Sequence, residues 1–205
     1  MRCQLQLFCM LTAAATTAGA ASLQLLTRFD PTPPAATIQE MRAELGRLYS
    51  DARISIAWHE LSNYSSVGAA LPIVYVDFIG NCRSRNLPAH QTATGVALAG
   101  VSRVDGKMLP SVTVDCEQIA AYIWPFMTGA QRSNGDAVFG EVLGRILAHE
   151  LYHYLTGTVK HTASALFRGA ISPRALLDRK LKLEEGEIAL LEGALSSMAV
   201  PPGSL

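Results

Sequence analysis

One stretch of this chain, residues 136 to 161, constrains the fold more than any other. It reads DAVFGEVLGRILAHELYHYLTGTVKH and places His149 and His153 four residues apart. On an α-helix, residues four apart lie on the same face, so the two imidazoles point the same way and can bind one metal ion. Glu150 lies about 100° around the helix from His149, where its carboxylate can reach a water on the metal without binding the metal itself.

The pattern of apolar residues predicts that this helix is buried. Apolar side chains occupy both the histidine side and the opposite face: Phe139, Val142, Leu143, Ile146, Leu147, Leu151 and Leu155. A helix that is apolar nearly all round lies inside the protein. Its narrow polar strip carries Glu141 and Arg145, spaced as a favourable pair. Gly140 and Gly144 share one face, where the missing side chains allow a sheet or another helix to approach closely.

The end of this helix supplies a third candidate ligand. Gly157 predicts the helix terminus, because glycine readily adopts the left-handed conformation that turns the chain back. His161 follows four residues later on the returning chain. Three protein nitrogens leave one position of a tetrahedral zinc ion open for water, which is the arrangement typical of a catalytic site.

These five residues, His149, Glu150, His153, Gly157 and His161, together resemble the metzincin branch of the zincin metallopeptidases. In that branch a glycine-turned helix presents two histidines and a third histidine follows the turn. The longer spacing found here, H-E-L-x-H-x-L-x-G-x-x-x-H, resembles a set of secreted bacterial zincin-like proteins. The resemblance covers roughly thirty residues and is only general elsewhere.

The chain departs from the metzincin pattern H-E-x-x-H-x-x-G-x-x-H in two respects. Its glycine and last histidine lie eight and twelve residues after His149, and residues 165 to 167, Ala-Leu-Phe, occupy the region of the metzincin Met-turn without a methionine. A rival hypothesis takes the third ligand from a later helix, as in the gluzincin branch, where the candidates are Glu184, Glu185 and Glu187. These carboxylates also have an explanation that involves no metal: acidic residues in the first turn of a helix complement the helix dipole.

The resemblance implies an α+β, zincin-like fold. We expect a twisted, mostly antiparallel or mixed sheet with a backing helix, a buried active-site helix and a small helical C-terminal part. The implied function is hydrolysis of peptide bonds in a polypeptide substrate by a Zn²⁺-activated water, with Glu150 as general base. The alternative is a catalytically inactive exported binding protein on a zincin scaffold, although a structural zinc site has no need of Glu150.

The first twenty residues predict export. Arg2 precedes an apolar run that ends in Ala18-Gly19-Ala20, which is typical of a signal peptide cleaved before Ala21. The run is too short, and too often interrupted by threonine, for a membrane-spanning helix, so we expect no stable membrane insertion of the mature chain. The predicted location is therefore secreted or periplasmic.

Cysteine usage and charge agree with an exported hydrolase. Removal of the signal peptide leaves Cys82 and Cys116, which we expect to form one disulfide. The alternative is a pair of buried thiols in a cytosolic protein. The formal net charge is zero, which gives no electrostatic case for a nucleic-acid partner. Cleavage specificity and oligomeric state are left open.

Local patterns divide the mature chain into elements. Residues 21 to 36, rich in proline at their end, are expected as an extended leader, and whether they act as a pro-segment is left open. Residues 37 to 205 are expected as a single catalytic domain. The expected helices are 38–49, 116–124, one that begins at 173, and 183–198. The expected strands are 53–58 and 72–79, followed by apolar runs at 93–104 and 109–114 that a hairpin turn joins across 105 to 107. The resemblance to zincins implies an antiparallel edge strand that binds the substrate backbone, and we expect it within 95 to 102.

Overall fold

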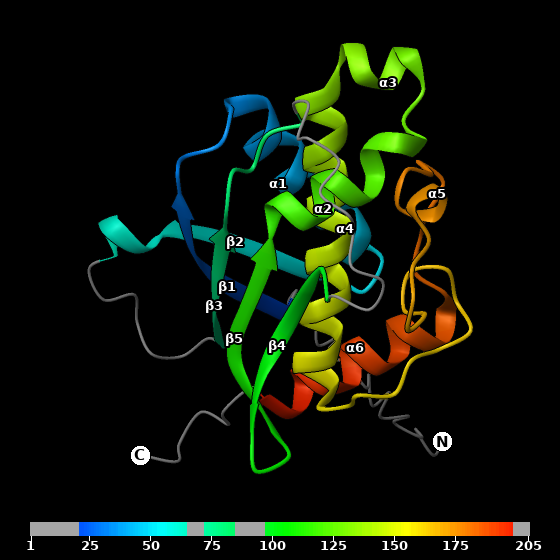
Figure 1. Cartoon of the computed structure of the whole chain (residues 1–205). Helices are drawn as coiled ribbons and strands as arrows, with labels where there is room; N and C mark the ends of the chain where they lie inside the picture. The colour runs from blue at the N-terminus through cyan, green and yellow to red at the C-terminus, as the bar shows by residue number, and fades with distance from the viewer. Residues whose placement is uncertain (1–20, 65–71, 85–96, 199–205) are drawn as a thin grey trace, which may run out of the picture.

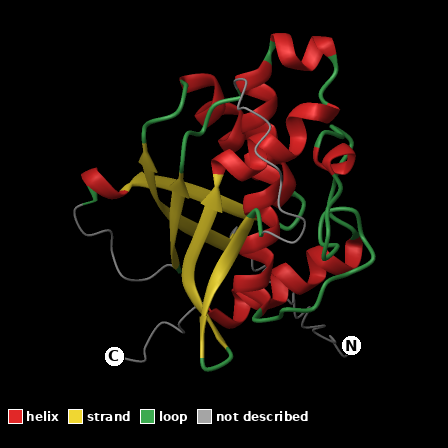
Figure 2. Ribbon diagram, viewed as in Figure 1, coloured by secondary structure: helices red, strands yellow, loops and turns green. Residues whose placement is uncertain are grey.

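The computed structural model describes residues 21–64, 72–84 and 97–198, which form a five-stranded sheet with the longer helices packed along one side (Figures 1 and 2). The strand order is β2-β1-β3-β5-β4. The bounds of the strands, in chain order, are β1 (Ala21–Asp30), β2 (Ile54–Glu60), β3 (Ile73–Ile79), β4 (Ala99–Val104) and β5 (Lys107–Asp115).

The sheet is mixed, as expected, but parallel pairing predominates, so the expectation of a mostly antiparallel sheet was wrong. β1 pairs in parallel with β2 and β3, and β3 pairs in parallel with β5. The antiparallel pair is β4 with β5. The physical reason lies in the connections: β1 and β2 are joined through helix α1 (Ala35–Ser50), and a helical crossover returns the chain in the same direction. The sequence interpretation missed this unit because it did not recognise β1 as a strand.

Residues 21 to 36 are therefore part of the domain rather than a leader ahead of it. Residues 21 to 30 form β1, which lies between β2 and β3, and its Leu23 and Leu25 are completely buried. Residues 35 and 36 already belong to α1. The prolines that suggested a leader lie in the short connection between the strand and the helix. The predicted signal peptide, residues 1 to 20, lies outside the described residues.

The predicted hairpin forms between β4 and β5. Asp105 and Gly106 both adopt positive φ values, of 49° and 78°, as a two-residue turn between twisted strands requires. β4 is an edge strand of the sheet and includes residues 99 to 102 of the expected substrate-binding edge. Residues 95 and 96 of that expectation lie outside the described part of the chain.

The motif helix is α4 (Gly135–Thr156), which ends at Gly157 in the left-handed conformation, with a φ of 62°. Nearly all of its residues are buried. Gly140 and Gly144 face α1: a Cβ on Gly140 would lie 2.4 Å from the carbonyl oxygen of Thr37, and a Cβ on Gly144 would lie 2.8 Å from that of Met41. The two helices therefore approach so closely that any side chain at either glycine would meet main-chain atoms.

A buried ionic cluster also joins α1 to α4. The side chain of Arg145 is 1% exposed, and its Nε donates to Glu44 Oε1 of α1 at 2.6 Å. Arg145 also donates to the carbonyl oxygen of Leu176 and to Glu141, which in turn binds Arg179. The expected Glu141–Arg145 pair is thus one part of a larger cluster, in which Arg145, Glu44 and Glu141 are buried and Arg179 is exposed.

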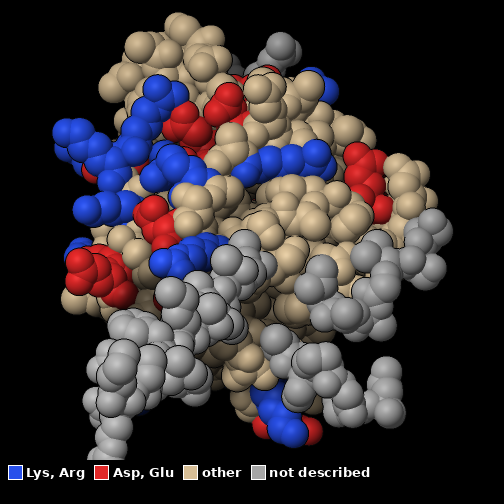
Figure 3. All heavy atoms as spheres, turned by 180° about the vertical axis from the view of Figure 1, so that it is seen from behind, with Lys and Arg blue, Asp and Glu red and all other residues tan. Residues whose placement is uncertain are grey.

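The remaining helices are short or lie late in the chain. They are η1 (Leu61–Asn63), α2 (Cys116–Ile123), η2 (Trp124–Phe126), α3 (Gly129–Ser133), α5 (Pro173–Leu176) and α6 (Glu185–Met198). The sulfur atoms of Cys82 and Cys116 are bonded, which ties the chain after β3 to the start of α2. No helix within residues 21–64, 72–84 and 97–198 is long and apolar enough to cross a bilayer. Seen from behind, basic and acidic side chains are interspersed, in keeping with the zero net charge (Figure 3).

Candidate metal centre

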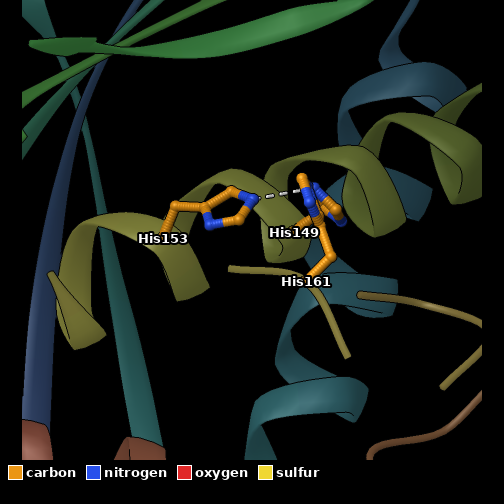
Figure 4. Close-up of side chains that lie close together, drawn as sticks. All are labelled: His149, His153 and His161. Atoms are coloured by element: carbon orange, nitrogen blue, oxygen red, sulfur yellow. Dashed lines mark hydrogen bonds between the residues drawn. The ribbon is translucent and has the colours of Figure 1, made fainter. Parts of the chain in front are cut away.

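Three histidine side chains converge beside the C-terminal half of α4 (Figure 4). His149 and His153 come from successive turns of α4, and His161 comes from the chain that returns after Gly157. One ligand nitrogen from each of the three lies within 4.8 Å of the others. His149 and His153 are buried, whereas His161 is exposed. The structure thus brings together the three residues that the sequence predicted as ligands.

Main-chain carbonyls fix the orientation of the two helical imidazoles. Nδ1 of His149 lies 2.8 Å from the carbonyl oxygen of Leu166, and Nδ1 of His153 lies 2.7 Å from that of Thr158. A carbonyl oxygen only accepts, so each Nδ1 carries the proton and donates it. Each Nε2 is then left with a lone pair. Carbonyl contacts of this kind orient histidines that bind metals.

The arrangement of the two Nε2 atoms fits a shared cation. They lie 3.0 Å apart, and two lone pairs at that distance repel each other unless a positive charge lies between them. Histidine nitrogens bind zinc at about 2.0–2.1 Å, which in a tetrahedral site separates neighbouring nitrogens by about 3.3 Å. The donor set and its spacing therefore fit zinc.

The protonation states agree with this role. Burial lowers the pKa of His149 to about 4, an effect that the hydrogen bond to Leu166 partly offsets and the nearby His153 reinforces. Burial also lowers the pKa of His153. Both imidazoles are therefore neutral at pH 7, which is the form that binds a metal ion.

The rival third ligands are placed differently. Glu187 is buried, and both of its carboxylate oxygens already accept hydrogen bonds, from Thr162 Oγ1 at 2.7 Å and from the backbone N–H of Glu184 at 2.9 Å. The side chains of Glu184 and Glu185 are exposed at the start of α6. Among the described residues, the group able to hold a metal consists of the three histidines.

Glu150 lies next to this group on α4 and is buried. Burial raises the pKa of its carboxyl to about 7, and a hydrogen bond from the backbone N–H of Val101 partly opposes the rise. Val101 belongs to β4, so the edge strand lies close to this carboxylate on α4. A carboxyl group with a pKa near neutrality can both accept and release a proton at pH 7.

Several residues that support the site were missed by the sequence interpretation. Phe167 stands where a Met-turn methionine was sought: its ring lies 5.9 Å from the His149 ring and stacks on Tyr152 at 4.1 Å. Leu166 and Thr158 act through their carbonyl oxygens, which every residue possesses, so no residue type could reveal them. Gly169 lies against His161, where a Cβ would be 3.1 Å from the ring Nδ1.

The fold and the site together define a mixed-sheet domain with a three-histidine candidate metal centre and a buried carboxylate beside it. No protein-family model matches the chain, and no curated protein matches it. Among solved structures, archaemetzincin from Methanopyrus kandleri is similar, with 10% sequence identity and a TM-score of 0.48. The similarity covers 89% of this chain and 99% of that chain.

Proposed function

We propose that this chain is a zinc-dependent metallopeptidase that hydrolyses peptide bonds. The observation that carries the proposal is the convergence of His149, His153 and His161, with Glu150 buried on the same helix. A structural zinc site needs neither an open ligand position nor a general base. A binding protein without catalytic activity likewise has no use for a buried carboxyl group with a raised pKa, so we favour hydrolysis over that alternative.

The roles of the residues follow from their positions. The three histidines would hold the ion through ring nitrogens, and the carbonyls of Leu166 and Thr158 would keep two of the rings in place. When bound, zinc supplies Lewis-acid polarisation of the scissile carbonyl and lowers the pKa of a water molecule in its open position. Glu150 accepts a proton from the attacking water and passes it to the nitrogen of the leaving amine as the C–N bond breaks.

The edge strand β4 gives the substrate a place to lie. An edge strand has unpaired main-chain groups along one side, and an extended peptide can pair with them as an added strand. β4 is such an edge, and it packs against α4, the helix that carries Glu150. A peptide bound along β4 would therefore pass close to the general base.

Export is part of the same proposal. Its support is the apolar N-terminal run followed by Ala18-Gly19-Ala20, together with the bonded pair Cys82–Cys116, since disulfides persist outside the reducing cytosol. The mature enzyme would begin at Ala21 and act in the periplasm or outside the cell.

Replacing Glu150 with glutamine tests the proposed chemistry. Glutamine keeps the size of the side chain but cannot accept the proton, so we expect Glu150→Gln to lose about 100-fold or more of its rate on a quenched-fluorescent peptide library. Zinc content should be unchanged, because Glu150 is not a ligand. The matched control is Glu192→Gln, an exposed change on α6 that should leave the rate unaltered. Equal hydrolysis by Glu150→Gln and the wild type would contradict the assigned role.

A further inference from the structure

We infer that Glu187 is a positioning residue for the third metal ligand, acting through Thr162 on the segment that carries His161. The inference rests on the proposed function in one respect, namely that a metal ion binds the three histidines. It gives Glu187, one of the rival ligands, a different role: its carboxylate fixes the chain beside the metal centre instead of binding the metal.

The contacts of Glu187 show why it does not need to bind the metal. The residue is 3% exposed and lies in the first turn of α6. Its Oε1 accepts from the hydroxyl of Thr162 at 2.7 Å, and its Oε2 accepts from the backbone N–H of Glu184 at 2.9 Å. A buried carboxylate is stable only with such partners, so the side chain is held between the start of α6 and the ligand segment.

The hydroxyl of Thr162 links this carboxylate to the rest of the segment. It lies 2.9 Å from the hydroxyl of Ser164, and the Ser164 N–H donates to it at 3.2 Å. A threonine has a single hydroxyl proton, and the carboxylate is both the closer and the stronger acceptor. Thr162 therefore donates to Glu187, and the Ser164 hydroxyl donates to Thr162.

These side-chain bonds close a compact turn next to His161. The N–H of Thr162 donates to the carbonyl oxygen of Phe167 at 2.9 Å, and the N–H of Phe167 donates to the Ser164 hydroxyl at 3.2 Å. Within this turn lies Leu166, whose carbonyl oxygen holds Nδ1 of His149. The turn therefore supports one ligand directly and carries another at its start.

His161 depends on this support more than the other two ligands do. It is exposed, and its ring has no hydrogen-bond partner among residues 21–64, 72–84 and 97–198. His149 and His153, in contrast, are fixed by a helix and by carbonyl contacts. A ligand on a segment outside regular structure binds well only if that segment is already ordered, because ordering it on binding costs entropy. The bond from Thr162 to Glu187 orders the residue next to His161.

The primary test is Thr162→Val, which removes the hydroxyl with little change in volume. Zinc affinity would be measured by competition with a chromophoric chelator, and Co²⁺ substituted for zinc would report the ligand set through its visible absorption bands. We expect Thr162→Val to raise the Kd for zinc about 10- to 100-fold, the range for losing an outer hydrogen-bond partner. The Co²⁺ spectrum should shift toward that of His161→Ala. Thr162→Ser keeps the hydroxyl and should restore both readouts.

The matched control is Glu184→Gln, which alters an exposed carboxylate at the start of the same helix. It retains the backbone N–H that donates a hydrogen bond to Glu187. It should leave zinc affinity unchanged. Glu187→Ala should raise the Kd for zinc as Thr162→Val does. The unfolding transition of each metal-free variant shows whether it folds, and Thr162→Val alone decides the matter if Glu187→Ala does not fold.

A double substitution separates an effect through His161 from a general loss of structure. If Thr162 acts on His161, adding Thr162→Val to His161→Ala should weaken zinc binding by less than Thr162→Val does in the wild-type chain, because the effects of residues that act through one another are not additive. The inference would be overturned if Thr162→Val bound zinc as tightly as the wild type. It would also be overturned if Thr162→Val weakened zinc binding equally in the wild-type and His161→Ala chains. Failure of the proposed function gives a different result: a wild-type chain that binds no zinc, or a His149→Ala variant that binds it undiminished, removes the metal centre itself.

Discussion

The two imidazoles of α4 are set for metal binding by groups that the sequence does not display. The spacing of His149 and His153 was enough to predict that both rings point the same way, and the pair lies as expected. The carbonyl oxygens of Leu166 and Thr158, which decide the tautomers, come from a segment outside regular structure. Their positions depend on how that segment folds back, and no periodicity in the sequence encodes this.

The buried ionic cluster at Glu44 gives a residue-scale prediction for the pH dependence of stability. Burial alone would raise the pKa of Glu44, but hydrogen bonds and charges from Arg47 and Arg145 lower it below the ordinary value of 4.5. A carboxyl group whose pKa is lower in the folded state stabilises the fold above the unfolded value and loses that contribution as the pH falls through the folded value.

We therefore expect Glu44→Gln to lower the free energy of unfolding by about 3 kcal/mol at pH 7, since it removes one partner of the buried Arg145. The difference in unfolding free energy from the wild type should shrink as the pH falls below 4.5. The wild-type carboxyl then becomes protonated and, like the glutamine amide, carries no charge. Urea unfolding at several pH values measures this. The exposed change Glu192→Gln should show almost no difference at any pH, and a constant gap for Glu44→Gln would contradict the assignment.

At the scale of elements, the sequence pattern predicted part of the contact between α1 and α4. The motif helix was expected to end at Gly157, and it extends over Gly135–Thr156 with Gly157 as its left-handed cap. A close approach at Gly140 and Gly144 was also expected, but the sequence left its partner open between a sheet and a helix. The partner is α1, because its main chain fills the space that the two glycines leave.

This contact predicts opposite effects for two substitutions to alanine. Alanine in an open helix position stabilises by up to about 1 kcal/mol relative to glycine. Gly193→Ala on α6 meets nothing within 4 Å and should show that gain. Gly144→Ala places its Cβ 2.8 Å from the Met41 carbonyl oxygen, so strain should outweigh the gain and leave a net loss of about 1 to 2 kcal/mol. Thermal unfolding compares the two, and a stabilised Gly144→Ala variant would show that the helices separate easily.

At the scale of the whole molecule, the sheet contains an internal strand, β1, that sequence reasoning assigned to a leader. The hairpin of β4 and β5 was predictable because its turn is local and Asp105-Gly106 marks it. The expected strands at 53–58 and 72–79 also form, as β2 and β3. The strand β1 and the parallel pairing of β1 with β2 and β3 were not predictable, because parallel strands pair across long connections that leave no local signal. The mixed sheet could be expected only in outline, through the resemblance of the metal motif.

The position of β1 inside the sheet predicts which N-terminal truncations still allow the chain to fold. A chain beginning at Ala21 keeps the whole of β1 and should unfold in one cooperative transition. A chain beginning at Pro31 lacks the strand between β2 and β3, including the buried Leu23 and Leu25, and should not fold. Circular dichroism during heating compares the two, and a folded shorter chain would show that β1 is dispensable.

The same boundary tests export. Protein recovered outside the cytoplasm should have the mass of a chain that begins at Ala21, because cleavage there leaves β1 intact. Recovery of the full-length chain only in the cytoplasm would contradict the proposed signal peptide.

The three-histidine metal centre is tested most directly by the metal content and zinc affinity of the chain from Ala21 onward, measured beside His161→Ala. We expect one zinc ion per wild-type chain. The loss of affinity in His161→Ala should exceed the roughly 100-fold that loss of an outer hydrogen-bond partner causes, because a ligand itself is removed. A folded wild-type chain that takes up no zinc when zinc is supplied, or a His161→Ala variant that binds zinc as tightly as the wild type, would contradict the centre described here.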